Sequence, residues 1–381
     1  MRNLIERDAE RSGFRNYWHQ VSRYPVAVRR EHELDDGFAV LWPAGSAIKQ
    51  PLSIEYQDVF GMQEAGIDGG GLTKEFLLEA CKQALHPDRG LFVETADRQL
   101  HPVTSPAART KKALMQYEFL GRLVGKCIYE GILIDASFAP FFLLKWIGKM
   151  SYLDDLQSLD KDLYMGLLKL KDYTGNVEED LALDFTLTET SATGTTTINL
   201  IPNGSDTPVT RLNRLQYIHL VCHYKLNARY RKQAEAFVNG LGAVLNPKWL
   251  AMFSTSELQA LIGGNPVPID VAELKRNTQY GGFSKDDATV NIFWYCLEHR
   301  FTEDERRMLI KFVTSTPRPP LLGFQMLSPK FSIRHAGTDV ARLPTASTCV
   351  NLLKLPEYKD ADTLEQKLRL AITGHAGFDL S

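Results

Sequence analysis

Apolar positions recur along the chain with the periods that strands and helices require. The alternation of Leu52, Ile54 and Tyr56 predicts a strand that begins near Pro51, and alternating positions with many threonines predict a short β hairpin or a meander over residues 181–201. A spacing of three and four residues is typical of helices. It predicts helices over residues 1–23, 77–85, 111–131, 138–150 and 211–240.

The C-terminal third has shorter elements. Thr302 and Glu305 have the spacing of a capping box before the apolar residues 308–313, which predicts a helix start. Strands are expected at residues 331–334 and within residues 343–356. A last helix has one apolar face and ends at Gly374; that face consists of Leu364, Leu368, Ala371 and Ile372. Residues 263–268, rich in Gly and Pro, predict a boundary between a larger N-terminal and a smaller C-terminal part.

Composition and charge narrow the class of protein. Apolar residues make up 44% of the 381 residues, as in folded domains, and 44 basic against 46 acidic residues leave a net charge of -2. No basic field would hold a nucleic acid or an anionic membrane. Asp135 and Lys145 interrupt the most apolar stretch, and the N-terminus lacks a secretory signal. We therefore expect a reducing compartment, the cytoplasm or the nucleus.

Two motifs fall short of the sites that they suggest. Residues 66–73 nearly spell a phosphate-binding loop, but Leu72 stands where the lysine is needed, so we interpret the stretch as a structural turn. His219 and His223 have zincin spacing, but Leu220 replaces the glutamate and no third ligand is near. We expect no metal and no cofactor.

The five cysteines contain no CxxC pair and are odd in number, which favours free thiols. Four lie in predicted helices among apolar neighbours, as core residues do: Cys81, Cys127, Cys222 and Cys296. Cys349 differs, because it follows Pro344 and four small residues that cannot cover it. An accessible thiol there can act as a nucleophile. From the pattern alone, a structural and a catalytic role both stay open.

Taken together, these residues resemble the HECT family of ubiquitin-protein ligases, from about residue 25 to the last residue. Cys349, 32 positions before the C-terminus and followed by Asn351, is the most specific match. The matching stretches, in family order, are residues 66–76, 119–126, 175–179, 312–318, 343–349 and 377–378. Residues 319–324 and 377–381 resemble the branch of HECT ligases that associates with proteasomes.

The resemblance implies an α+β, bilobed fold. A mainly helical N-lobe, residues 25–266, would bind a ubiquitin-conjugating enzyme and follow a helical extension, residues 1–24. A hinge at Gly263 and Gly264 would join it to an α/β C-lobe, residues 267–381. Ubiquitin would form a thioester with Cys349 and then pass to lysines of protein substrates. The proteasome would be a further partner.

The resemblance also assigns roles to other residues. The conjugating-enzyme groove would consist of Leu167, Leu168, Leu170, Tyr173 and Phe185, with Asp180 at its rim. Phe378, fourth from the end, would assist the second transfer step. Many relatives have a histidine where this chain has Ser347, which leaves Thr348 or Asp379 for positioning or deprotonation.

Two other functions stay open at this stage. A cysteine hydrolase acting on ubiquitin-like conjugates would need no conjugating enzyme, and a binding module would use all its cysteines structurally. HECT ligases select substrates through long upstream segments, and only about 25 residues precede the resemblance here. We therefore expect this chain to be part of a longer ligase.

Overall fold

The computed structural model describes residues 1–11, 23–58, 61–62, 71–191 and 194–374. The chain divides into two compact units, the first made of residues 1–83, 123–136 and 256–381 and the second of residues 84–122 and 137–255. This division by contacts cuts across the predicted N-lobe, and the lobe boundary at residues 266 and 267 stays a prediction. No helix among the described residues has the length and apolar character needed to cross a membrane.

The N-terminal part of the first unit contains two parallel strands. β1 (Tyr24–Arg29) pairs with β2 (Leu52–Gln57), with Val26 opposite Ile54, and α2 (Glu33–Leu41) lies in the crossover that parallel strands require. The alternating side chains of β2 are buried, as the sequence predicts. The other helices here are α1 (Arg2–Arg11), α3 (Gly71–Leu85) and α4 (Lys111–Glu130), the last of which continues into the second unit.

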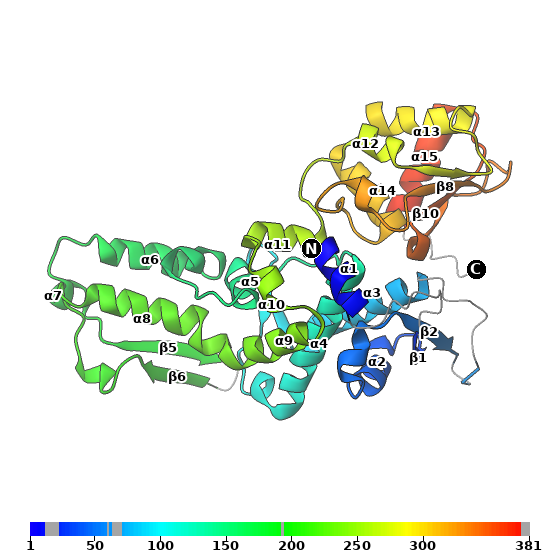
Figure 1. Cartoon of the computed structure of the whole chain (residues 1–381). Helices are drawn as coiled ribbons and strands as arrows, with labels where there is room; N and C mark the ends of the chain where they lie inside the picture. Colours follow the sequence, from blue (N-terminus) through cyan, green and yellow to red (C-terminus); the bar gives the residue numbers. More distant parts are fainter. Residues whose placement is uncertain (12–22, 59–60, 63–70, 192–193, 375–381) are drawn as a thin grey trace. The chain divides into compact units, whose positions relative to one another are not determined.

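The C-terminal part of the first unit is built around a four-stranded sheet in the order β7-β8-β10-β9, in which only the β10–β9 pair is antiparallel. In Figure 1 the helices α12 to α15 gather around β8 and β10. Their apolar faces form one buried core with the sheet. The elements are α11 (Thr255–Gly263), α12 (Val271–Arg276), β7 (Gln279–Gly281), α13 (Ala288–His299), α14 (Glu303–Thr314), β8 (Ser332–His335), β9 (Thr345–Ser347), β10 (Leu352–Leu355) and α15 (Ala361–Thr373).

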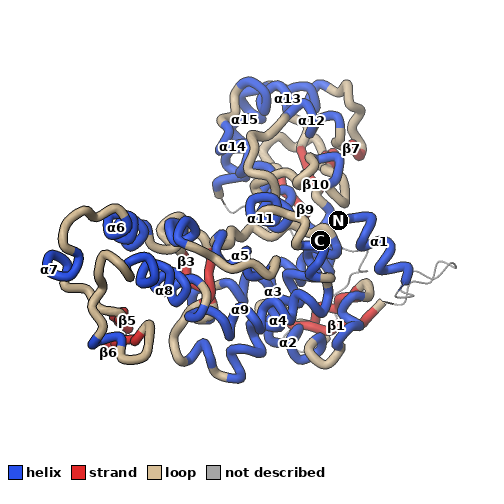
Figure 2. The backbone as a smooth tube through the Cα atoms, turned by 60° about the vertical axis from the view of Figure 1, so that its left-hand side comes forward, coloured by secondary structure: helices blue, strands red, loops and turns tan. Residues whose placement is uncertain are grey.

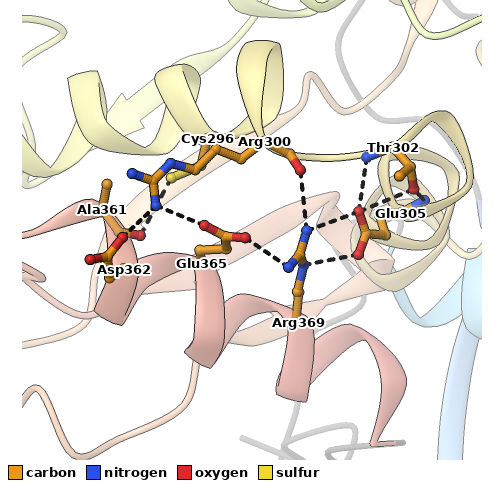
Figure 3. A network of polar contacts seen from close by, with 8 residues as sticks. All are labelled: Cys296, Arg300, Thr302, Glu305, Ala361, Asp362, Glu365 and Arg369. Atoms are coloured by element: carbon orange, nitrogen blue, oxygen red, sulfur yellow. Dashed lines mark hydrogen bonds and ion pairs between the residues drawn. The ribbon is translucent and has the colours of Figure 1, made fainter.

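A chain of ion pairs ties α13, α14 and α15 together at their polar edge (Figure 3). Arg369 of α15 contacts Glu305 at 2.9 Å and Glu365 at 2.7 Å, and Glu365 in turn contacts Arg300 at 2.8 Å. Glu305 also completes the predicted capping box, since it accepts from the Thr302 N–H at 2.8 Å while the Thr302 hydroxyl accepts from the Glu305 N–H. The cap and the ion pairs therefore fix the start of α14 against α15.

The second unit is mainly helical. Its elements are β3 (Phe92–Glu94), β4 (Leu100–Pro102), α5 (Pro140–Trp146), η4 (Leu153–Ser158), α6 (Lys161–Lys171), α7 (Val177–Leu181), β5 (Thr186–Ser191), β6 (Gly194–Asn199), α8 (Arg214–Leu226), η6 (Ala228–Tyr230), α9 (Arg231–Val244) and α10 (Pro247–Leu250). Figures 1 and 2 both show the predicted hairpin, β5 and β6, running beside α8. Phe237 of α9 is the centre of an aromatic core and stacks on Trp146 with ring centroids 4.7 Å apart.

Several predicted helix bounds are wrong. The helix predicted over residues 211–240 is two helices, because Asn227 leaves helical geometry (φ -121°, ψ -65°) and its side chain bonds Lys145 and both backbone groups of Ser151. α3 begins at Gly71 rather than Leu77, and α5 is shorter than residues 138–150. Of the helix predicted over residues 1–23, the described part is α1.

Candidate active site around Cys349

Cys349 lies at the tip of a hairpin in the first unit. β9 and β10 pair up to Ser347 and Leu352, and the four residues between them form the turn, η8 (Thr348–Val350) followed by Asn351. Asn351 closes the turn in the left-handed region, with φ 53° and ψ 43°, which asparagine tolerates better than most residues. The short loop therefore holds Cys349 away from the sheet.

The accessibility of the five cysteines agrees with the sequence analysis. All five are free and lie in the described part of the chain. Cys81, Cys127, Cys222 and Cys296 are buried, whereas Cys349 is partly exposed. Cys349 is therefore the thiol that a reagent or a protein partner can reach most readily.

The start of α3 packs directly against this thiol. A Cβ atom placed on Gly71, the first residue of α3, would lie 3.1 Å from the Cβ of Cys349 and 3.4 Å from its Sγ. A side chain at residue 71 would therefore press on the side chain of Cys349. The glycine-rich stretch, interpreted above as a structural turn, thus ends beside Cys349.

Lys74, one turn along α3, connects the helix to the cysteine loop. Its ammonium is buried and donates to the Thr348 carbonyl at 2.7 Å, the Asn351 Oδ1 at 2.6 Å and the Thr314 carbonyl at 3.1 Å. Asn351 is itself fully buried, and its Nδ2 donates to the Pro329 carbonyl at 2.6 Å. These contacts hold both sides of the residue that bears the thiol.

Burial and the two neighbouring charges of α3 all act on the ionisation of Cys349. Partial burial raises the pKa of the thiol, as does the Glu75 carboxylate, while the Lys74 ammonium lowers it, and the net pKa is above that of a free thiol. Burial also lowers the pKa of Lys74, to about 8. The thiol therefore has a smaller thiolate fraction at neutral pH than a free cysteine.

The other residues assigned to catalysis by resemblance are only partly placed. Thr348 adjoins Cys349, and its backbone carbonyl is the group that bonds Lys74. Phe378 and Asp379 lie outside the described residues. The sequence analysis missed Lys74 and Asn351 as site residues; the signal available was a lysine three positions after the three glycines at residues 69–71.

The proposed groove needs correction. Phe185, Leu167 and Leu170 are at most 5% exposed, so they are not the surface anchors that the resemblance implied. The two leucines are on the buried face of α6, and the Phe185 ring packs edge-on against Tyr217 with centroids 5.6 Å apart. These three residues belong to the core of the second unit.

The remaining assigned residues do reach the surface of the second unit. Leu168 and Tyr173 are partly exposed, Asp180 is exposed, and the Tyr173 hydroxyl donates to the Asp180 carboxylate at 2.8 Å. Exposed apolar side chains not assigned from the sequence also belong to this unit: Met150, Tyr152, Met165, Leu181, Leu212 and Leu215. Leu212 is 97% exposed.

A cavity of about 190 Å3 lies between residues 150–153 and α8 in the same unit. Its lining includes Met150, Tyr152 and Leu215 together with His219 and His223, whose ring centroids are 6.3 Å apart. Among the described residues, no three His, Cys, Asp or Glu side chains are grouped so as to hold a metal ion. The two histidines therefore line an apolar cavity.

Only one of the two glycines of the predicted hinge lies in a loop. Gly263 is the last residue of α11 and is buried, and the loop begins at Gly264, which has φ +84°. A Cβ atom on Gly264 would lie 2.7 Å from the Cβ of Arg318 and from the Pro319 carbonyl oxygen. This close packing describes one conformation, and reorientation at the hinge stays a prediction.

Comparisons with known proteins show which family the chain belongs to. Residues 78–381 match the HECT-domain (ubiquitin-transferase) family. The chain is 49% identical over its whole length to the probable E3 ubiquitin protein ligase C167.07c of Schizosaccharomyces pombe. It is 44% identical over 95% of its length to the E3 ubiquitin-protein ligase HUL5 of Saccharomyces cerevisiae, and 39% identical over 93% to the human ubiquitin-protein ligase E3B. It spans 37%, 40% and 36% of these relatives. The chain belongs to the HECT family of ubiquitin transferases.

Proposed function

We propose that this chain accepts ubiquitin from a conjugating enzyme as a thioester on Cys349 and transfers it to lysines of protein substrates. The observation that carries the proposal is the exposure of Cys349 at a hairpin tip while the other four cysteines are buried. Membership of a transferase family supports it. We further propose that the chain acts in the cytoplasm or nucleus, with the proteasome as a partner.

The chemistry is two successive acyl transfers. The Cys349 thiolate attacks the carbonyl carbon of the incoming thioester, a new C–S bond forms, and the bond to the conjugating enzyme's sulfur breaks, so that its thiolate leaves and takes up a proton. The neutral amine of a substrate lysine then attacks the same carbon, a C–N bond forms, and the C–S bond to Cys349 breaks; Cys349 leaves as the thiolate and is balanced by the proton that the nitrogen loses. Exchange of one thiol for another is nearly balanced, so a thiol with a raised pKa suffices when it is well positioned.

The test is adduct formation with ubiquitin, activating enzyme, conjugating enzyme and ATP. Wild-type protein should form an adduct that a thiol reductant removes. Cys349→Ser should form an oxyester that resists the reductant, Cys349→Ala should form none, and the control Cys222→Ala should behave as wild type. A reducible adduct on Cys349→Ala would contradict the proposal. Ubiquitin release without a conjugating enzyme would favour a cysteine hydrolase.

We place the conjugating enzyme on the second unit, at the surface formed by Leu168, Tyr173 and Asp180. Exposed leucines of this unit, such as Leu215, add apolar area of the kind that anchors interfaces. Tyr173→Ala and Leu215→Ala should each slow loading of Cys349 at limiting conjugating enzyme, whereas Leu370→Ala removes a leucine of similar exposure from α15 and should not. Equal loading in all three variants would place docking elsewhere.

Phe378, by resemblance, serves the second transfer. Phe378→Ala should load Cys349 normally and discharge slowly to a free lysine acceptor in a single-turnover chase of preloaded protein. Orientation of that kind acts on the rate of attack and not on the nucleophile. An unchanged rate of discharge would remove Phe378 from the mechanism.

A further inference from the structure

Lys74 is a buried charge with an unusual set of partners. An ammonium has three N–H bonds, and the three acceptors within reach are the Thr348 carbonyl, the Asn351 Oδ1 and the Thr314 carbonyl, at 2.6 to 3.1 Å. A buried charge is costly unless it is paired or fully hydrogen-bonded. No carboxylate is among these three partners, so hydrogen bonds to neutral oxygens replace the water that the ammonium has lost.

All three acceptors belong to the segment that follows α11, far from Lys74 in sequence. Thr348 and Asn351 lie one residue before and two residues after Cys349. Thr314 is the last residue of α14, where the helix dipole favours a cation. Lys74 thus fixes the cysteine loop at two points and joins it to the end of α14.

Asn351 links the Lys74 contact to Pro329 and to the backbone of the turn. Its side chain accepts from Lys74 and donates to the Pro329 carbonyl, while its backbone supplies the left-handed residue that closes the turn. Loss of the Lys74 contact would leave a fully buried amide oxygen without this partner. The Lys74 ammonium and Asn351 together therefore restrain the loop that bears the thiol.

We propose that Lys74 is the positioning residue of the transfer reaction: it holds the Cys349 loop in register with α3, and its positive charge favours the thiolate. This inference rests on the proposed function of Cys349. Lys74 is not the general base, because each of its three N–H bonds donates to an acceptor. A neutral amine has one N–H bond fewer and would leave one of these acceptors without its partner. It acts through Cys349 and through Asn351.

The charges that face the thiol are those of α3. Lys74 lowers the pKa of Cys349, and its neighbour Glu75 raises it. Glu75 is in turn paired with Arg30 at 2.6 Å. Removing the Lys74 charge leaves only backbone hydrogen bonds to oppose burial and Glu75, so below the pKa of Lys74 a smaller fraction of the thiol should be ionised. The same change on an exposed lysine of α3 should have no such effect, and Lys82, paired with Glu79 at 3.2 Å, provides that control.

The experiment measures the rate of alkylation of Cys349 by iodoacetamide as a function of pH, with the labelled peptide identified by mass spectrometry. The pKa of Lys74, about 8, is below that of the thiol, so its charge acts on the low-pH part of the profile: Lys74→Met should slow alkylation below about pH 8 and approach the wild-type profile above it. It should also slow transfer of ubiquitin by roughly ten- to a hundredfold, the usual effect of a misplaced reacting group. Lys82→Met should change neither. A Lys74→Met profile that superimposes on that of the wild type, with unchanged transfer, overturns the proposal.

Asn351→Gly separates position from charge and decides the matter if Lys74→Met fails to fold. Glycine adopts the left-handed turn without strain, so the variant loses the side-chain link but keeps the Lys74 charge. It should transfer ubiquitin at least tenfold more slowly while its alkylation profile stays close to that of the wild type. Transfer at the wild-type rate would show that the link does not position the loop. Alkylation needs no ubiquitin, so failure of the proposed function would appear separately, as a wild-type protein that forms no adduct.

Discussion

The close crossing of α4 and α9 in the second unit predicts how substitution of a glycine there changes the free energy of unfolding. A Cβ atom on Gly240 would lie 1.8 Å from the Glu118 carbonyl oxygen, and one on Gly121 would lie 2.0 Å from the Phe237 carbonyl oxygen. Each glycine therefore allows the backbone of the opposite helix to approach. Alanine favours a helix by about 1 kcal/mol relative to glycine, so on helix propensity alone Gly240→Ala would stabilise the protein.

The structure predicts the opposite sign. Ordinary contact begins at 3.4 Å, so Gly240→Ala requires α9 and α4 to separate by about 1.6 Å. Phe237 of α9 would move with the helix, and it packs against four other rings. A gap of 0.5–1 Å forfeits about a quarter to a half of a dispersion contact. Four aromatic pairs of about 1 kcal/mol each then lose about 2 kcal/mol, and strain adds about 1–3 kcal/mol. After the gain in propensity, Gly240→Ala should destabilise the protein by about 2–4 kcal/mol.

Gly166→Ala is the matched control. Gly166 lies within α6 of the same unit, and nothing is within 4 Å of the position of its Cβ. This variant should gain about 0.5–1 kcal/mol. Urea unfolding followed by circular dichroism measures both, with the slopes compared to check that the midpoints report stability. A Gly240→Ala midpoint at or above that of the wild type would refute the argument from close packing.

Two further predictions concern other buried positions. Burial lowers the pKa of His101 to about 4, so between pH 6.5 and 4 the unfolded chain takes up a proton that the folded one does not. The free energy of unfolding should therefore fall by about 3 kcal/mol over that range. In urea titrations, His101→Gln should lose this part of the pH dependence. Gly264→Ala should cost more than Gly148→Ala: both glycines have positive φ, but only Gly264 would place a Cβ atom against Pro319, and equal thermal shifts would contradict this.

Much of the fold could be predicted because its signals are local. The alternation in β2, the capping box at Thr302 and the apolar face of α15 each arise within a few residues, and the structure confirms all three. The break between α8 and α9 was not predictable in this way. It depends on Asn227 bonding Ser151, which is 76 residues away.

The residues assigned to the groove show that the resemblance did not predict which side chains are exposed. Apolar residues on an amphipathic helix look alike in sequence whether they face a partner or their own core. Leu167 and Leu170 turned out to face inward, and Phe185 is covered by Tyr217. Leu215, exposed in the structure, carries no signal in the sequence that distinguishes it from a core residue.

The candidate site also has one part that the sequence predicts and one that it does not. The accessibility of Cys349 follows from its own neighbours, Pro344 and a run of small residues, and could be predicted. The restraint on Cys349 could not, because Lys74 and Asn351 are separated by 277 positions and meet only in the folded chain. A lysine after three glycines has no local feature that distinguishes it from a solvated one. The fold alone buries Lys74 and gives it three hydrogen-bond partners, none of them a carboxylate. A substitution of Lys74 is therefore the change that best tests whether the position of the thiol matters in addition to its exposure.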